Sequence, residues 1–157
     1  CGGFLRFHRS LLTILKETQM AKISAKGAVI TIDDSAGSPQ DLSTDCVSFE
    51  IQQDAGVIDV TGFGDGSKNF IPGLPVTGIT FEFLYDTHTT SGAYTVLKGI
   101  LNSATSKTVS VKPETAGETL SGEFCLDNFA VKGTPDGALS IGTVHFSVMG
   151  GTAPAWA

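Results

Sequence analysis

Glycines stand at alternate positions in the segment Gly62-Phe-Gly-Asp-Gly66, a spacing that resembles phosphate-binding loops. Such a loop needs a helix directly after its glycines, because the N–H groups at a helix N-terminus bind the anion. Here SKNFIPGLP follows, and its prolines and glycine exclude a helix. Lys68 alone does not make a P-loop. The glycines therefore indicate turns in an extended segment, and we expect no nucleotide or other cofactor.

Metal-binding and nucleophilic residues are scattered along the chain. The histidines and cysteines are His8, His88, His145, Cys1, Cys46 and Cys125. No histidine has a second histidine or cysteine two to four residues further along, and no cysteine belongs to a C-x-x-C pair, so neither a zinc site nor a disulfide framework is predicted. The cysteines are interpreted as reduced thiols of a protein made inside a cell.

Acidic residues offer no better case for a site. Asp33, Asp34, Asp41 and Asp45 carry oxygen ligands, but their spacing does not match a calcium-binding loop. No nucleophile elbow is present, and Glu82 and Glu123 are read as solvated acids on strands. We expect no metal, no catalytic residue and no enzymatic activity.

The composition describes one β-rich domain. The chain has 157 residues, of which 41% are hydrophobic and 17% charged, with 19 glycines and no apolar run long enough to cross a membrane. Both arginines lie in the first 19 residues, and seven lysines oppose 15 acids in the remainder. An acidic body without arginine argues against tight nucleic-acid binding, although weak contact with DNA stays compatible with it.

Residues 1–19 differ from the rest of the chain. They place Phe4, Phe7, Leu11 and Leu15 on one stripe of a basic amphipathic helix, and an acidic sequence begins at Met20. Two interpretations stay open: a non-native upstream extension, or a helix that docks on a partner. A signal peptide is disfavoured because no small-residue cleavage site follows. Residues 20–157 are predicted to form a single β domain.

Alternation of apolar and polar residues predicts the strands. Along 77–86, Ile79, Phe81, Phe83 and Tyr85 share one face, which makes this the strongest strand prediction. Segment 45–53 places Val47, with two further apolar residues, on its buried face. The other predicted strands are 26–34, 108–113, 122–133 and 139–149.

One helix is predicted at about residues 91–104, with Thr90 or Ser91 as its cap. The apolar residues at helical spacing are Ala93, Val96, Leu97, Ile100, Leu101 and Ala104. A long connection runs from Asp54 to about Val76, and apolar residues on so long a loop indicate a functional surface. With no βαβ rhythm, the fold class is mainly β: a β-sandwich or partly open barrel with one flanking α-helix.

The order of these features resembles the tail tube, or major tail, proteins of long-tailed bacteriophages. The resemblance rests on Asp59-Val-Thr-Gly-Phe-Gly-Asp-Gly-Ser-Lys-Asn-Phe-Ile-Pro-Gly-Leu74, then Gly78-Ile-Thr-Phe-Glu-Phe-Leu-Tyr-Asp86, then the helix and a β-rich C-terminal half. It spans roughly residues 22–150, and the first 19 residues have no counterpart.

This resemblance implies a virion protein, made in the host cytoplasm, whose hexameric rings stack into a conduit for genome ejection. Its partners would be other copies of itself and the tape-measure and tail terminator or initiator proteins, with DNA passing through unbound and no membrane involved. The implied contact residues between subunits or rings are Phe63, Asp65, Lys68, Phe70, Ile71, Pro72 and Leu74.

Two other classes stay open. A capsid decoration or other accessory virion protein has the same β-rich, acidic character but assembles as trimers or monomers. A carbohydrate-binding β-sandwich module needs exposed aromatic side chains, for which the chain offers Trp156, Tyr85 and Tyr94.

Overall fold

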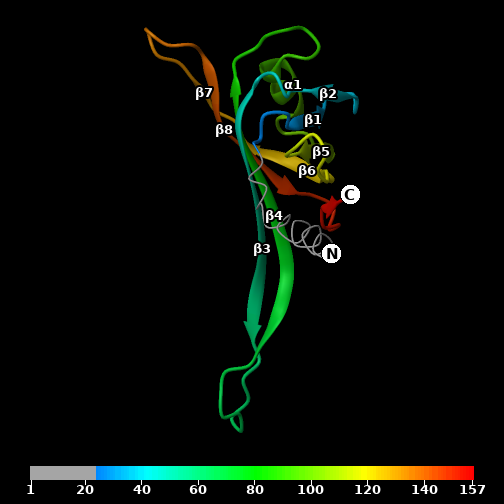
Figure 1. Ribbon diagram of the computed structural model, residues 1–157, viewed down its shortest axis with the longest axis vertical. Coiled ribbons are helices and arrows are strands. Elements are labelled where there is room, and N and C mark those ends of the chain that lie inside the picture. Colours follow the sequence, from blue (N-terminus) through cyan, green and yellow to red (C-terminus); the bar gives the residue numbers. More distant parts are fainter. Residues whose placement is uncertain (1–23) are drawn as a thin grey trace, which may run out of the picture.

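The computed structural model describes residues 24–157, which form an open antiparallel sheet and a short helix (Figure 1). The predicted helix at 1–19 lies outside this range. The elements are β1 (Val29–Asp33), β2 (Pro39–Asp41), β3 (Cys46–Asp59), β4 (Phe70–Leu84), α1 (Ala93–Ile100), β5 (Lys107–Lys112), β6 (Leu120–Asn128), β7 (Val131–Lys132), β8 (Ser140–Val148) and β9 (Ala155–Trp156).

The strands follow the order β2-β1-β5-β6-β8-β4-β3, while β7 pairs with β8 and β9 pairs with β6. The sheet does not close, so β2 and β3 lie at its edges. This confirms the predicted mainly β class with one helix.

The core lies where the alternating strands turn their apolar faces inward. Ile79, Phe81 and Phe83 of β4 are fully buried, as the alternation along 77–86 predicts. The Phe81 ring lies 5.4 Å from that of Phe83 and meets the Phe146 ring of β8 edge-on at 5.9 Å. These contacts join β4 to β8 within one core.

The helix is shorter than predicted. It spans Ala93–Ile100 rather than 91–104, and its buried face consists of Ala93, Val96, Leu97 and Ile100. Leu101 and Ala104, which the helical spacing also placed on this face, are exposed. Asn102 has a φ of 60°, a left-handed conformation that cannot continue a helix.

The predicted helix cap is also wrong. Gly92 is the N-cap and supplies no side chain, while the Ser91 hydroxyl contacts His88 Nδ1 at 3.1 Å instead. Asp45, distant in the sequence, accepts a hydrogen bond from the Ala93 N–H at 3.2 Å. A tertiary contact from the segment before β3 therefore replaces the local cap.

A β-bulge corrects the predicted face of Val47. The register between β3 and β4 shifts between Cys46 and Ser48, which leaves Val47 opposite no partner and 61% exposed. Cys46 takes the inward position and packs against the core with Phe49. Burial raises the pKa of the Cys46 thiol to about 11.

The largest difference concerns the predicted connection from Asp54 to Val76. Most of it is strand, because β3 continues to Asp59 and β4 already begins at Phe70. Smaller differences are the unpredicted β2 and β9 and the division of predicted strand 122–133 into β6 and β7.

Candidate assembly surface

Residues 54–76, here named the arm, form a hairpin that extends away from the rest of the sheet (Figure 1). Val57 pairs with Pro72, Ile58 with Ile71, and Asp59 with Phe70. The neighbouring strand β8 pairs with β4 only from Gly78 onward. Beyond that point the arm is a two-stranded ribbon without a third strand to support it.

The arm exposes an unusual number of apolar side chains. Phe63 is fully exposed and Leu74 is 88% exposed. The other exposed large apolar residues of the arm are Val57, Ile58, Val60, Phe70, Ile71 and Val76. An isolated hairpin is marginal in water, and a contiguous apolar surface of this kind marks an interaction site.

Both faces of the arm contribute to this surface. The register places Ile58 beside Ile71 on one face and Val57 beside Pro72 on the other. Between Ala55 and Val57 the register shifts, and a Cβ on Gly73 would lie 2.9 Å from the Gly56 carbonyl oxygen. Glycine therefore permits the close approach of the two strands at this bulge.

The tip of the arm, residues 60–69, is ordered by its own hydrogen bonds. The Asp59 carboxylate accepts hydrogen bonds from the Thr61 N–H and hydroxyl, and these lower the pKa of Asp59. The Thr61 hydroxyl in turn accepts the Asn69 N–H at 2.9 Å, and the Val60 N–H donates to the Asn69 carbonyl. These bonds give the tip a defined shape.

The seven residues predicted as contacts all lie on the arm: Phe63, Asp65, Lys68, Phe70, Ile71, Pro72 and Leu74. Two of them also hold the tip together. Asp65 accepts the Gly62 N–H at 2.8 Å, which positions Phe63 between the two, and Lys68 lies 3.8 Å from Asp59. None is buried, so all seven are accessible to another molecule.

The face of the sheet opposite the core is polar and largely neutral or acidic. The Thr108 hydroxyl donates to Glu123 at 2.7 Å, and the Ser48 hydroxyl donates to Glu82 at 3.0 Å. Hydrogen bonds from Ser106 and Thr108 lower the pKa of Glu123. At these positions the face presents hydroxyls and carboxylates, and the alternation of β5 adds Lys112 to the same face.

Sequence reasoning missed a cluster on the same face. His145 Nδ1 lies 2.8 and 2.9 Å from the two carboxylate oxygens of Asp127, and the Ser147 hydroxyl donates to the same carboxylate. Alternation along β8 places His145 and Ser147 together, but a register shift between Leu126 and Asn128 brings Asp127 to them. Because Ser147 bonds Asp127 and not the imidazole, the cluster lacks the serine–histidine bond of an activated nucleophile.

The four aspartates considered for calcium are used by the fold. Asp34 accepts the Ala36 and Ser38 N–H groups in the β1–β2 turn, and these bonds help to lower its pKa. The carboxylates of the other three bond elsewhere: Asp33 to Thr108, Asp41 to Ser43 and Asp45 to Ala93. Within residues 24–157, no three histidines, cysteines or acids are grouped closely enough to hold a metal ion.

The aromatic residues considered for sugar binding do not form a platform. Tyr85 and Tyr94 stack at 4.6 Å and pack against the core, whereas Trp156 lies in β9. In the part of the chain that the structure covers, no helix combines the length and the apolar character needed to span a membrane.

The fold is one found in phage-like particles. A chain in the virion of the native gene transfer agent particle superposes with a TM-score of 0.69 and 15% identity, covering 86% of this chain and 98% of that one. A chain in the C6-symmetric tail of the empty gene transfer agent particle gives a TM-score of 0.67 and 16% identity, covering 82% and 94%. The resemblance predicted from the sequence is confirmed at the level of fold.

No family model and no curated protein matches the sequence. At such low identity, the shared property is the path of the chain through the sheet.

Proposed function

We propose that this chain is a structural subunit of a phage-like tail whose copies polymerise through the arm into stacked six-membered rings. The observation that carries the proposal is the pair of apolar faces on the unsupported arm. Moving a side chain such as Leu74 from water into an apolar contact is favourable by about 2 kcal/mol, and a monomer does not gain this free energy. Burial against a second copy recovers it.

The open sheet supports a ring as the unit of assembly. The outer edge of β3 offers unpaired backbone groups to a neighbour, and β2 lies at the opposite edge. Exposed edges invite uncontrolled pairing unless they are covered, and a closed ring of identical subunits covers them all.

The polar face of the sheet suits the wall of a DNA conduit. Ser48, Glu82, Thr108 and Glu123 line part of it, and carboxylates repel phosphates rather than hold them. In this role the protein is located in the virion after synthesis in the host cytoplasm, is not an enzyme, and meets the tape-measure and the terminator or initiator proteins at the tube.

Assembly of an arm variant tests the proposal. Ile71→Asp places a charge on the apolar arm and is expected to leave a folded monomer that forms no tubes. Val131→Asp is the matched control, because Val131 of β7 is 45% exposed, close to the 47% of Ile71, but lies outside the arm. Circular dichroism reports folding, and negative-stain microscopy of the concentrated full chain reports assembly.

Rings or tubes of uniform diameter in the wild type and in Val131→Asp, but not in Ile71→Asp, are the expected result. Normal tubes from Ile71→Asp would contradict the role of the arm. Discrete trimers of the wild type would instead identify an accessory protein of the capsid surface.

A further inference from the structure

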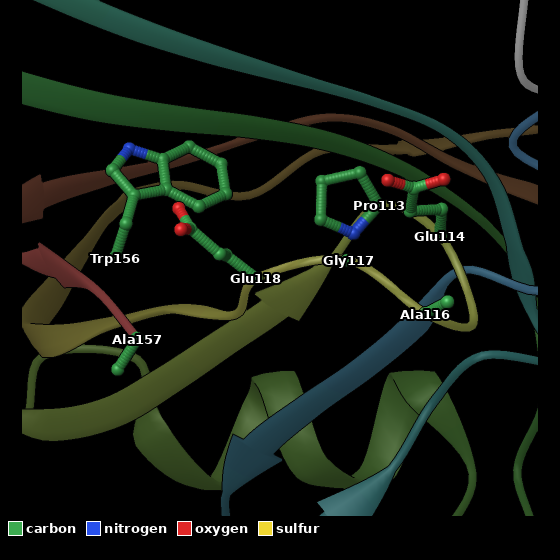
Figure 2. Close-up of a pocket in the computed structure, with 7 residues that line it drawn as sticks. All are labelled: Pro113, Glu114, Ala116, Gly117, Glu118, Trp156 and Ala157. Carbon is green, nitrogen blue, oxygen red and sulfur yellow. The ribbon is translucent and has the colours of Figure 1, made fainter. Parts of the chain in front are cut away.

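A groove of about 630 Å³ lies between the turn at residues 113–118 and the C-terminal strand β9 (Figure 2). Trp156 forms part of one wall. Its indole Nε1–H donates to the Gln53 side-chain oxygen at 3.1 Å, and its backbone pairs with Leu120 of β6. The indole is therefore held in place while 41% of the residue stays exposed.

Two carboxylates lie along this groove, and of these the Glu118 carboxylate adjoins the indole. Figure 2 shows the Glu118 carboxylate beside the Trp156 indole and the Glu114 carboxylate near the Pro113 ring. Neither acid forms an ion pair within residues 24–157, where the two pairs are Lys68–Asp59 and His145–Asp127. An indole face with two unpaired carboxylates suits a cation next to an apolar or aromatic group.

Most described lysines are engaged on the body itself. Lys107 is buried and donates to the Ser35 carbonyl, and Lys98 lies 5.6 Å from the centre of the Tyr94 ring. The stem of Lys132 lies against Gly142, and Lys112 is half-buried in β5. Lys26 is exposed but lies next to Gly27, where an added Cβ would be 2.5 Å from Thr115 Oγ1 in the 113–118 turn of its own chain.

Lys68 differs from these five. Its side chain is 74% exposed at the tip of the arm, its ion-pair partner within residues 24–157 is Asp59 at 3.8 Å, and the same tip carries the fully exposed Phe63. The arm tip therefore carries a cation, Lys68, next to an aromatic ring, Phe63, and this is the combination that could bind in the groove. Figure 1 shows the tip far from the C-terminus of its own chain, so the two surfaces can meet only between copies.

Building on the proposed function, we propose that the groove receives the arm tip of a second copy. Phe63 packs against the Trp156 indole and the Pro113 ring, and Lys68 lies between Glu114 and Glu118. Because the tip and the groove are different surfaces of one chain, this contact is head-to-tail and propagates from subunit to subunit. The groove is then the surface of the neighbouring copy to which the arm tip binds.

Charge exchange tests this contact. Lys68→Glu alone, and Glu114→Lys/Glu118→Lys alone, are each expected to raise the protein concentration needed for tube formation by about tenfold, and the combined variant is expected to restore it. Lys132→Glu, which changes a lysine outside the arm, is the matched control and should assemble as the wild type does.

Cross-linking identifies the partner surfaces directly. A mixture of Gly64→Cys and Ala116→Cys chains, oxidised after assembly, should yield a disulfide-linked heterodimer between these two positions. If the wild type forms tubes but neither rescue nor this heterodimer appears, the groove assignment is overturned and the arm proposal stands. A link from Ala116→Cys to Cys1 would also overturn the groove assignment, because residues 1–19 would then occupy the groove.

Failure of the wild type to assemble at all would overturn the proposed function itself.

Discussion

Single carboxylates on the polar face contribute to the fold as well as to its charge. Glu123 accepts hydrogen bonds from Ser106 and Thr108, and these hold its pKa below the ordinary value. A carboxyl group with a lowered pKa in the folded state stabilises the fold above its unfolded pKa of about 4.3. That contribution is lost as the pH falls through the lower, folded pKa.

Substitution of this residue gives a prediction with a defined pH dependence. Glu123→Gln should lower the melting temperature at pH 7 by roughly 2–4 °C, because a charged acceptor is replaced by a neutral one in a domain of this size. Below about pH 4 the difference from the wild type should shrink. Thermal melts followed by circular dichroism between pH 3 and pH 7 measure this; a constant difference over that range would contradict it.

For helix α1, the sequence predicted the buried face but neither the cap nor the end of the helix. The spacing of Ala93, Val96, Leu97 and Ile100 predicted the helix and its buried face correctly. The cap could not be predicted, because the residue that binds the Ala93 N–H is Asp45, which only the folded chain brings close. The end of the helix could not be predicted either, because it is set by the left-handed conformation of Asn102.

Two substitutions distinguish the tertiary cap by Asp45 from a local cap by Thr90. Asp45→Ala should lower the free energy of unfolding by about 1 kcal/mol, the usual cost of losing a helix cap. Thr90→Ala should change it by less than about 0.5 kcal/mol, because Thr90 is exposed and caps nothing. Urea denaturation of both variants gives the comparison, and equal losses would favour the local cap.

The arm could not be predicted as strand for a related reason. Strand patterns arise when one face is buried, but the two faces of the arm both meet solvent, so no alternation marks them. Pro72 and Pro75 are also atypical of a strand, since proline lacks the N–H that a central strand needs. They are tolerated because β4 has β3 on one side only in this stretch.

The seven predicted contact residues nonetheless all lie on the arm, because the sequence shows apolar residues such as Phe63 and Leu74 within a segment predicted to be a loop. Their role as contacts stays a prediction. The groove at Trp156 was not predicted, since its walls come from the 113–118 turn and β9, which meet only in the fold.

For the whole molecule, the proposed passage of DNA can be tested through the charge of the polar face. The polar face includes Glu50, which is exposed and pairs in register with Thr80. In the proposed tube this position is repeated around every ring. A lysine there would release counterions from passing DNA and hold it.

Glu50→Lys should therefore form tubes as the wild type does, but the tubes should retain DNA at low salt and release it at high salt. Asp136→Lys adds the same charge in the exposed turn between β7 and β8 and is the control, with no retention expected. Co-sedimentation of assembled tubes with duplex DNA over a salt series measures this. Equal retention by both variants would argue against this face as the lining.

The ribbon geometry of the arm also restricts how its length can change. Removing one residue from each strand of the arm shortens it by about 3.3 Å and turns every side chain beyond that point to the opposite face. Ile58 and Ile71 would then point where Val57 and Pro72 do now. Only changes of two residues per strand leave the apolar side chains on the faces that they now occupy. The length of the arm can therefore change only in steps of about 6.6 Å.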